Sequence, residues 1–134
     1  MEFFAIANVR TDPATLQACL NIDSLPRYCG AIDKVIEQQG DRGVIYCLWG
    51  QFSVHREAIK GGVRFSLTSC PNALAWTVTT GYPPASDRAV IHCTINRTEH
   101  EPELVESIES FVSDWRHGLE RHIGSALRHG DKKQ

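Results

Sequence analysis

Apolar residues recur at three- and four-residue spacing in the last quarter of this 134-residue chain. This period predicts one amphipathic helix over residues 102–127. Its apolar stripe consists of Leu104, Val105, Ile108, Phe111, Val112, Trp115, Leu119 and Ile123. At 1.5 Å per residue such a helix is roughly 39 Å long, whereas a domain of this size is only about 35 Å across. The helix must therefore cross the whole molecule against an equally long apolar surface. Its first turn has two candidate caps, Glu101 and Thr98.

The half of the chain before this helix has the two-residue period of β-strands. Apolar and polar residues alternate over residues 63–67, 74–78 and 91–95, which predicts antiparallel strands with one buried and one wet face. Gly61-Gly62 is the strongest hairpin signal. Further strands are expected over residues 3–9, 32–37, 44–49 and 52–59.

Two short helices are expected after the first strand. Asp12 is a good N-cap and Pro13 suits the first helical position, which predicts a helix over residues 13–20. Ser24 or Asp23 can cap a second helix over residues 26–30.

This order of elements resembles the helix-grip fold of the START-like superfamily, which includes the Bet v 1-like proteins and the polyketide cyclase/dehydratase group. Locally, Phe4-Ala5-Ile6-Ala7 lies in the first strand, a helix opens at Pro13, and Leu25-Pro26-Arg27-Tyr28 places an aromatic residue after a helix break. The resemblance implies an α+β fold with a curved antiparallel sheet of six or seven strands wrapped around the long C-terminal helix. A single domain over residues 1–128 and a polar tail over residues 129–134 are expected.

In this superfamily an apolar pocket lies between the concave sheet face and the C-terminal helix, so the resemblance implies a ligand site there. The alternation predicts which side chains face that space, although a filled core would place the same residues inward. The candidate ligand-binding residues are Phe52, Val54, Arg56, Phe65, Leu67, Trp76, Val78, Ile91, Cys93, Ile108, Phe111 and Trp115.

Arg56 is the most informative polar candidate. It shares strand parity with Phe52 and Val54, so an undisturbed strand points it inward, where a guanidinium needs an anionic or carbonyl partner. Either Arg56 orients a ligand carboxylate or carbonyl at the pocket mouth, or the strand ends before it and leaves it at the rim.

The composition of the chain limits the classes of partner and cofactor that we expect. A net charge of -2 argues against a nucleic-acid surface, and no apolar run approaches the ~20 residues of a membrane span, so stable membrane insertion is not expected. No secretory signal is recognisable, and five scattered cysteines suit a reducing cytoplasm. His117 and His122 lie about 140° apart around the helix, a poor metal pair, and no metal or cofactor is expected.

Three functions remain open. The first is binding of a hydrophobic small molecule (a lipid, a polyketide or an aromatic compound). The second is a cyclase or dehydratase that uses the same cavity, for which only Arg56, Tyr28, Tyr46 and His122 are plausible acid–base groups. The third is an interaction module with a filled core and an apolar outer surface or dimer interface, in which Trp49 is an interface residue and a homodimer is one of the open alternatives.

Overall fold

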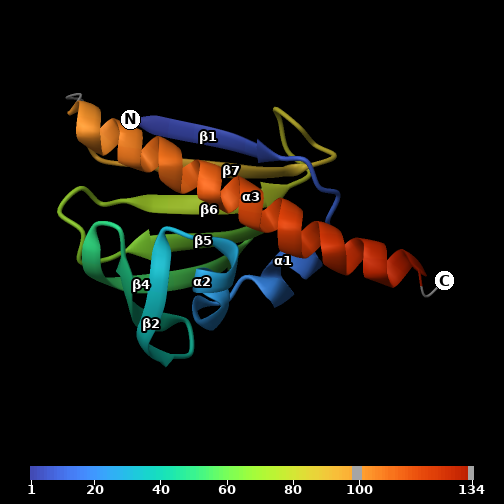
Figure 1. The fold of residues 1–134 in the computed structure, drawn as a ribbon, viewed down its shortest axis with the longest axis horizontal. Helices are drawn as coiled ribbons and strands as arrows, with labels where there is room; N and C mark the ends of the chain where they lie inside the picture. Colours follow the sequence, from blue (N-terminus) through green and yellow to red (C-terminus); the bar gives the residue numbers. More distant parts are fainter. Residues whose placement is uncertain (98–100, 133–134) are drawn as a thin grey trace.

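The computed structural model describes residues 1–97 and 101–132, with side chains described up to residue 123. Seven strands form one antiparallel sheet in the order β1-β7-β6-β5-β4-β3-β2, drawn in Figure 1. Their bounds are β1 Glu2–Ala7, β2 Ile32–Gln39, β3 Arg42–Cys47, β4 Gly50–Ile59, β5 Gly62–Leu67, β6 Ala75–Thr80 and β7 Ala89–Thr94. The seven-stranded antiparallel sheet confirms the sequence prediction.

Two short helices and one 3-10 turn follow β1: α1 (Pro13–Cys19), the turn Ile22–Ser24, and α2 (Leu25–Tyr28). The Asp12 side chain caps α1 by accepting a hydrogen bond from the Thr15 backbone N–H at 2.8 Å. Ser24 does not cap α2. Its hydroxyl instead accepts from the Asn21 N–H and donates to the Cys19 carbonyl, which closes the turn before α2.

The long helix α3 (Pro102–Lys132) begins at the predicted proline. Of its two candidate caps, Thr98 lies outside the described residues. Figure 1 shows α3 crossing one face of the sheet obliquely, from the end near the chain's N-terminus toward α1 and α2. The apolar stripe faces the sheet, and Ile108, Phe111, Trp115, Leu119 and Ile123 are all buried.

Strand register explains which side chains lie beneath α3. Phe65 is paired with Trp76, and Trp76 with Cys93, so one row of concave-facing residues runs across three strands. The adjacent row consists of Val63, Val78 and Ile91, all fully buried. The strand pairing agrees with the alternation predicted from the sequence. An antiparallel sheet packed against one long C-terminal helix is an α+β, helix-grip-like fold.

The concave face is closed at one end by α1 and α2. Gln17 of α1 donates from its side-chain amide to the carbonyls of Ile59 and Gly62 in the β4–β5 hairpin. At α2, the backbone of Tyr28 lies so near Gly118 that a Cβ added to that glycine would fall 1.7 Å from the Tyr28 carbonyl oxygen. At the other end of the sheet, which we call its open end, Leu67 and Leu74 lie beside Leu104 from the first turn of α3.

Candidate functional site

The centre of the space between sheet and helix is filled by aromatic rings. Phe65, Trp76, Phe111 and Trp115 are each at most 1% exposed. The Trp76 ring lies 5.3 Å from that of Phe65, 5.0 Å from that of Phe111 and 6.1 Å from that of Trp115, centroid to centroid. Four of the predicted ligand-binding residues therefore contact one another in the centre of the space where the resemblance implies a cavity.

This aromatic packing leaves two polar atoms without partners. Among the described residues, the indole N–H groups of Trp76 and Trp115 are buried and make no hydrogen bond. A buried, unpaired donor costs about 1 to 3 kcal/mol. The fold tolerates this cost in exchange for large rings that fill the centre, since each buries much apolar area.

A pocket of about 250 Å³ remains at the open end of the sheet, and we call it the end pocket. It lies where α3 begins and where β4, the β5–β6 turn and the end of β7 meet. Its walls are mostly apolar, with one amide and one thiol. The lining residues are Trp49, Phe52, Leu67, Cys70, Pro71, Asn72, Leu74, Ile95 and Leu104.

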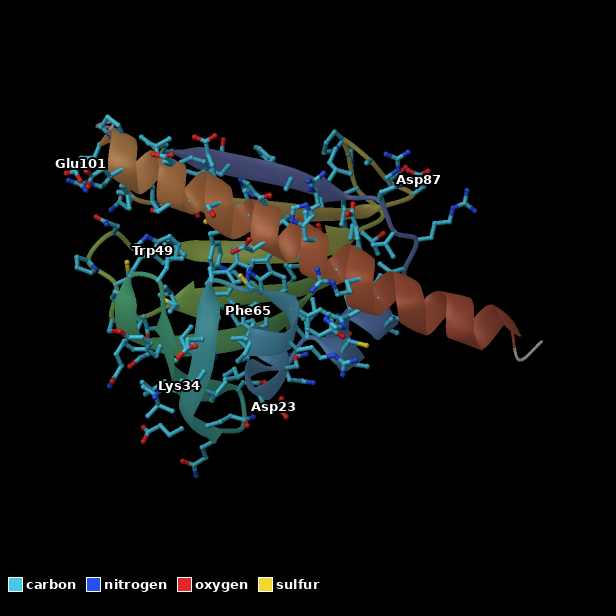
Figure 2. The ribbon with its side chains drawn as sticks, in the orientation of Figure 1. Asp23, Lys34, Trp49, Phe65, Asp87 and Glu101 are labelled. Carbon is cyan, nitrogen blue, oxygen red and sulfur yellow. The ribbon has the colours of Figure 1, made fainter. Side chains whose placement is uncertain are left out.

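Trp49 joins the end pocket to the aromatic centre. It lies in the two-residue turn between β3 and β4, and its indole N–H donates to the Ser107 hydroxyl at 2.9 Å. Its ring is 5.1 Å from that of Phe111. Figure 2 shows Trp49 toward the end of the sheet where α3 begins, while Phe65 lies nearer the middle. The prediction of a strand extending to Trp49 is wrong, because β3 ends at Cys47 and Gly50 takes a φ of +115° that allows a tight turn.

Arg56 points inward, as its parity predicts, but each of its three side-chain nitrogens already has a partner within the protein. Its Nε donates to the Leu20 carbonyl and its Nη2 to the Gln17 carbonyl, each at 2.7 Å. Its Nη1 lies 3.2 Å from the Asp41 carboxylate. These carbonyls belong to the last turn of α1 and the residue after it, so Arg56 satisfies a helix end and lies away from the end pocket.

The other predicted residues divide between the pocket wall and the core. Phe52 and Leu67 line the end pocket. Val54, Val78, Ile91, Cys93 and Ile108 are buried in the core. Burial raises the pKa of the Cys93 thiol to about 12, and it raises that of Cys29 to about 12 as well. Both thiols are therefore neutral and inert at ordinary pH.

The sequence prediction missed most of the end-pocket wall. The sequence does contain a signal for Ile95 and Leu104. The strand alternation predicts that Ile95 faces inward, and the helical stripe predicts the same for Leu104. The sequence predicts only a turn at Cys70, Pro71 and Asn72. What could have indicated them is their position three to five residues after the inward-facing Leu67.

The acid–base candidates do not meet in this pocket. Tyr28 and His122 contact each other where α2 crosses α3, with ring centroids 5.6 Å apart. Burial, then the nearby Cys19, raises the pKa of Tyr28. Burial, then the charges of Arg27 and Arg121, lowers the pKa of His122. Tyr46 is exposed.

A larger hollow of about 560 Å³ lies along β2, β3 and β4. Val44, Ser53 and His55 in its wall share the strand parity that points away from α3, and seven of its ten lining residues are polar or charged, with Glu37, Gln38, Gln39 and Arg42 among them. Since the wall is polar and largely on the outer face, the end pocket remains the better site for an apolar ligand.

Two further properties bear on partners. Within the described ranges, no three His, Cys, Asp or Glu side chains come together as metal ligands. None of the described helices combines the length and apolar character that crossing a membrane requires.

Comparisons with known proteins find solved structures of the same architecture. No family model matches the chain, and no curated protein matches it. Among solved structures, the protein XoxI from Bacillus cereus is similar, with a TM-score of 0.66 and 15% identity over 96% of this chain and 98% of that one. An uncharacterized protein from Bacillus thuringiensis is similar with a TM-score of 0.58 and 14% identity, over 89% of this chain and 98% of that one. At such identities the likeness extends to architecture alone.

Proposed function

We propose that this chain is a small START-like helix-grip protein that binds a compact apolar molecule in the end pocket. The observation that carries the proposal is the pocket itself, about 250 Å³ of mostly apolar wall between the sheet and the start of α3. An apolar cavity of about 150 Å³ holds benzene. The end pocket therefore suits a single substituted ring or a short chain, and an intact sterol or long polyketide is too large for it.

The polar groups in the wall define which end of such a ligand is recognised. Asn72 is the one amide among the lining residues, and an amide both donates and accepts hydrogen bonds. Its backbone is fixed because the Asn96 N–H donates to the Asn72 carbonyl at 2.7 Å, which ties the β5–β6 turn to the chain after β7. A ring carrying one hydroxyl or carbonyl is the best fit.

Binding is better supported than catalysis of the cyclase or dehydratase type. Such chemistry needs an acid or base within hydrogen-bond reach of the substrate. None of the residues lining the end pocket carries a carboxylate, an imidazole or a phenol. Arg56, Tyr28 and His122 are committed to contacts elsewhere in the fold.

The proposal is tested by titrating the protein with p-cresol, a single ring with one hydroxyl, and following the indole N–H resonance of Trp49 by NMR. We expect a saturable shift of the Trp49 signal and little change at Trp115, which is fully buried away from the pocket wall. Leu104→Trp should fill the pocket and abolish the response. Ser110→Trp, at an exposed position of the same helix, is the matched control.

Cysteine labelling gives an independent measurement on the same sample. Cys19 and Cys70 are partly exposed, whereas Cys29, Cys47 and Cys93 are buried. Only Cys70 lines the pocket, so p-cresol should slow alkylation of Cys70 by iodoacetamide and leave that of Cys19 unchanged. Equal rates with and without p-cresol, together with an unmoved Trp49 resonance, would exclude this site.

A further inference from the structure

The strand at one end of the sheet, β1, has a free edge. Met1 and Ile95 exchange both backbone hydrogen bonds, and bonding alternates along an antiparallel pair. Phe3, Ala5 and Ala7 therefore bond to β7. The N–H and C=O groups of Glu2, Phe4 and Ile6 point outward, where no strand of the described chain pairs with them.

This edge lacks the features that usually prevent strands from pairing with another chain. The opposite edge strand, β2, has two register irregularities and carries Asp33, Lys34 and Glu37. Bulges and charges of this kind protect sheet edges. Between Phe3 and Ala7, β1 has no charge and no proline, and it exposes Phe4 by 57% and Ile6 by 37%.

A groove runs beside this edge, between β1 and α3. It encloses about 330 Å³ and is lined by Phe3, Phe4, Ala5, Glu109, Val112, Ser113 and Arg116. Its lining includes two small side chains, Ala5 and Ser113, and one large one, Phe3. An edge strand beside a groove of this shape is suited to receiving an extended segment by strand addition.

We propose that the segment is β1 of a second copy, paired antiparallel about a two-fold axis at Phe4. This register places Phe4 opposite the partner's Phe4, as a hydrogen-bonded pair. It also places the partner's Phe3 opposite Ala5, where its ring enters the groove, and the reciprocal contact follows by symmetry. The two sheets then form one continuous sheet, and both copies of α3 lie on the same face, running antiparallel.

The charges along the groove agree with this symmetry. Glu109 and Arg116 lie on either side of Val112 and Ser113 along α3, and all four line the same groove as Phe4. A two-fold axis at Phe4 brings Glu109 near the partner's Arg116, and Arg116 near the partner's Glu109. A second copy necessarily presents the same two charges in reversed order, so we assign a second copy as the occupant of the groove.

Exchanging the charges at positions 109 and 116 tests this arrangement. Sedimentation velocity over protein concentrations from micromolar to millimolar measures dimerisation. We expect dimerisation for the full chain. Glu109→Arg alone and Arg116→Glu alone should each weaken it at least tenfold, since each places like charges opposite each other. The double variant should restore it, and a mixture of the two single variants should form heterodimers. A monomer throughout the series, or a dimer whose affinity neither single variant changes, would overturn the proposal.

A cross-linking pair tests the register. Hydrogen-bonded partners in an antiparallel ladder have Cα atoms about 5.5 Å apart, within disulfide range. Phe4→Cys should therefore form an intersubunit disulfide under mild oxidation. Ile6→Cys on the same exposed face is the control, because the two copies of position 6 would lie about 14 Å apart along the strands. Efficient cross-linking through position 6 instead of position 4 would show that this register is wrong.

Discussion

Arg56 holds α1 against the sheet through two main-chain carbonyls, so at the scale of single residues its replacement should cost stability. In Arg56→Met the carbonyls of Leu20 and Gln17 lose their donor. We expect a loss of about 2 to 3 kcal/mol in the free energy of unfolding, measured by urea denaturation. Asp41→Asn removes only the partly exposed ion pair and should cost no more than about 1 kcal/mol. Equal losses for the two variants would contradict a role in holding α1.

His122 should make the stability depend on pH, because burial and two arginines lower its pKa in the folded state. A depressed histidine pKa means that the unfolded chain binds more protons, so stability rises with pH across the affected interval. The contribution of His122 is complete above its unfolded pKa of about 6.5 and is lost as the pH falls toward the folded pKa. Unfolding measured by urea at several pH values should show this decline, and His122→Gln should reduce it. An identical pH profile in the variant would contradict the prediction.

At the scale of elements, the crossing of α3 over α2 depends on Gly118. Helix propensity alone predicts that Gly118→Ala stabilises α3 by about 1 kcal/mol. The added Cβ would instead meet the Tyr28 carbonyl, so we expect a net loss of about 1 to 3 kcal/mol in thermal or chemical unfolding. Ser110→Ala at an exposed position of α3 is the control and should be neutral or slightly stabilising. A stabilised Gly118→Ala would show that α2 and α3 are not held this closely.

The elements themselves could be predicted from the sequence because periodicity records which face is buried. Alternation in residues 63–67 placed Phe65 inward, and the helical stripe placed Phe111 and Trp115 opposite it. The end pocket could not be predicted in the same way, since turns supply Trp49, Pro71 and Asn72 to its wall. Trp49 reaches the pocket only because β3 ends at Cys47 and its indole bonds to Ser107. Asn72 is positioned by a bond to the Asn96 N–H from a distant segment.

Arg56 shows the same division between local and long-range information. Its parity predicted an inward guanidinium, and its inward position follows from an undisturbed β4. Its partners could not be inferred, because α1 reaches it from 36 and 39 residues away. The pattern within one strand predicts only that the charged Arg56 side chain points inward. Only the assembled fold shows that a helix end, and not a ligand, meets it.

At the scale of the whole molecule, the proposed binding function predicts that the aromatic rings limit the size of the ligand that the end pocket accepts. Phe111 lies between the end pocket and the centre, 5.1 Å from Trp49 and 5.0 Å from Trp76 between ring centroids. Phe111→Ala should therefore join the pocket to the space vacated in the core. We expect a stability loss of about 3 to 5 kcal/mol together with a new capacity to bind a two-ring probe such as 2-naphthol.

Phe65→Ala separates these two effects. Phe65 is equally buried and packs on Trp76 and Trp115, so its truncation should cost a similar 3 to 5 kcal/mol. It lies outside the end-pocket wall, and the vacated space stays closed off behind Trp76 and Phe111. Calorimetric titration with p-cresol and 2-naphthol compares the two variants in the folded state at low temperature. If 2-naphthol bound both variants equally, or neither, ring packing at Phe111 would not be what limits ligand size. Selective uptake by Phe111→Ala would mean that a helix-grip interior can be closed by a single ring while its mouth remains able to bind.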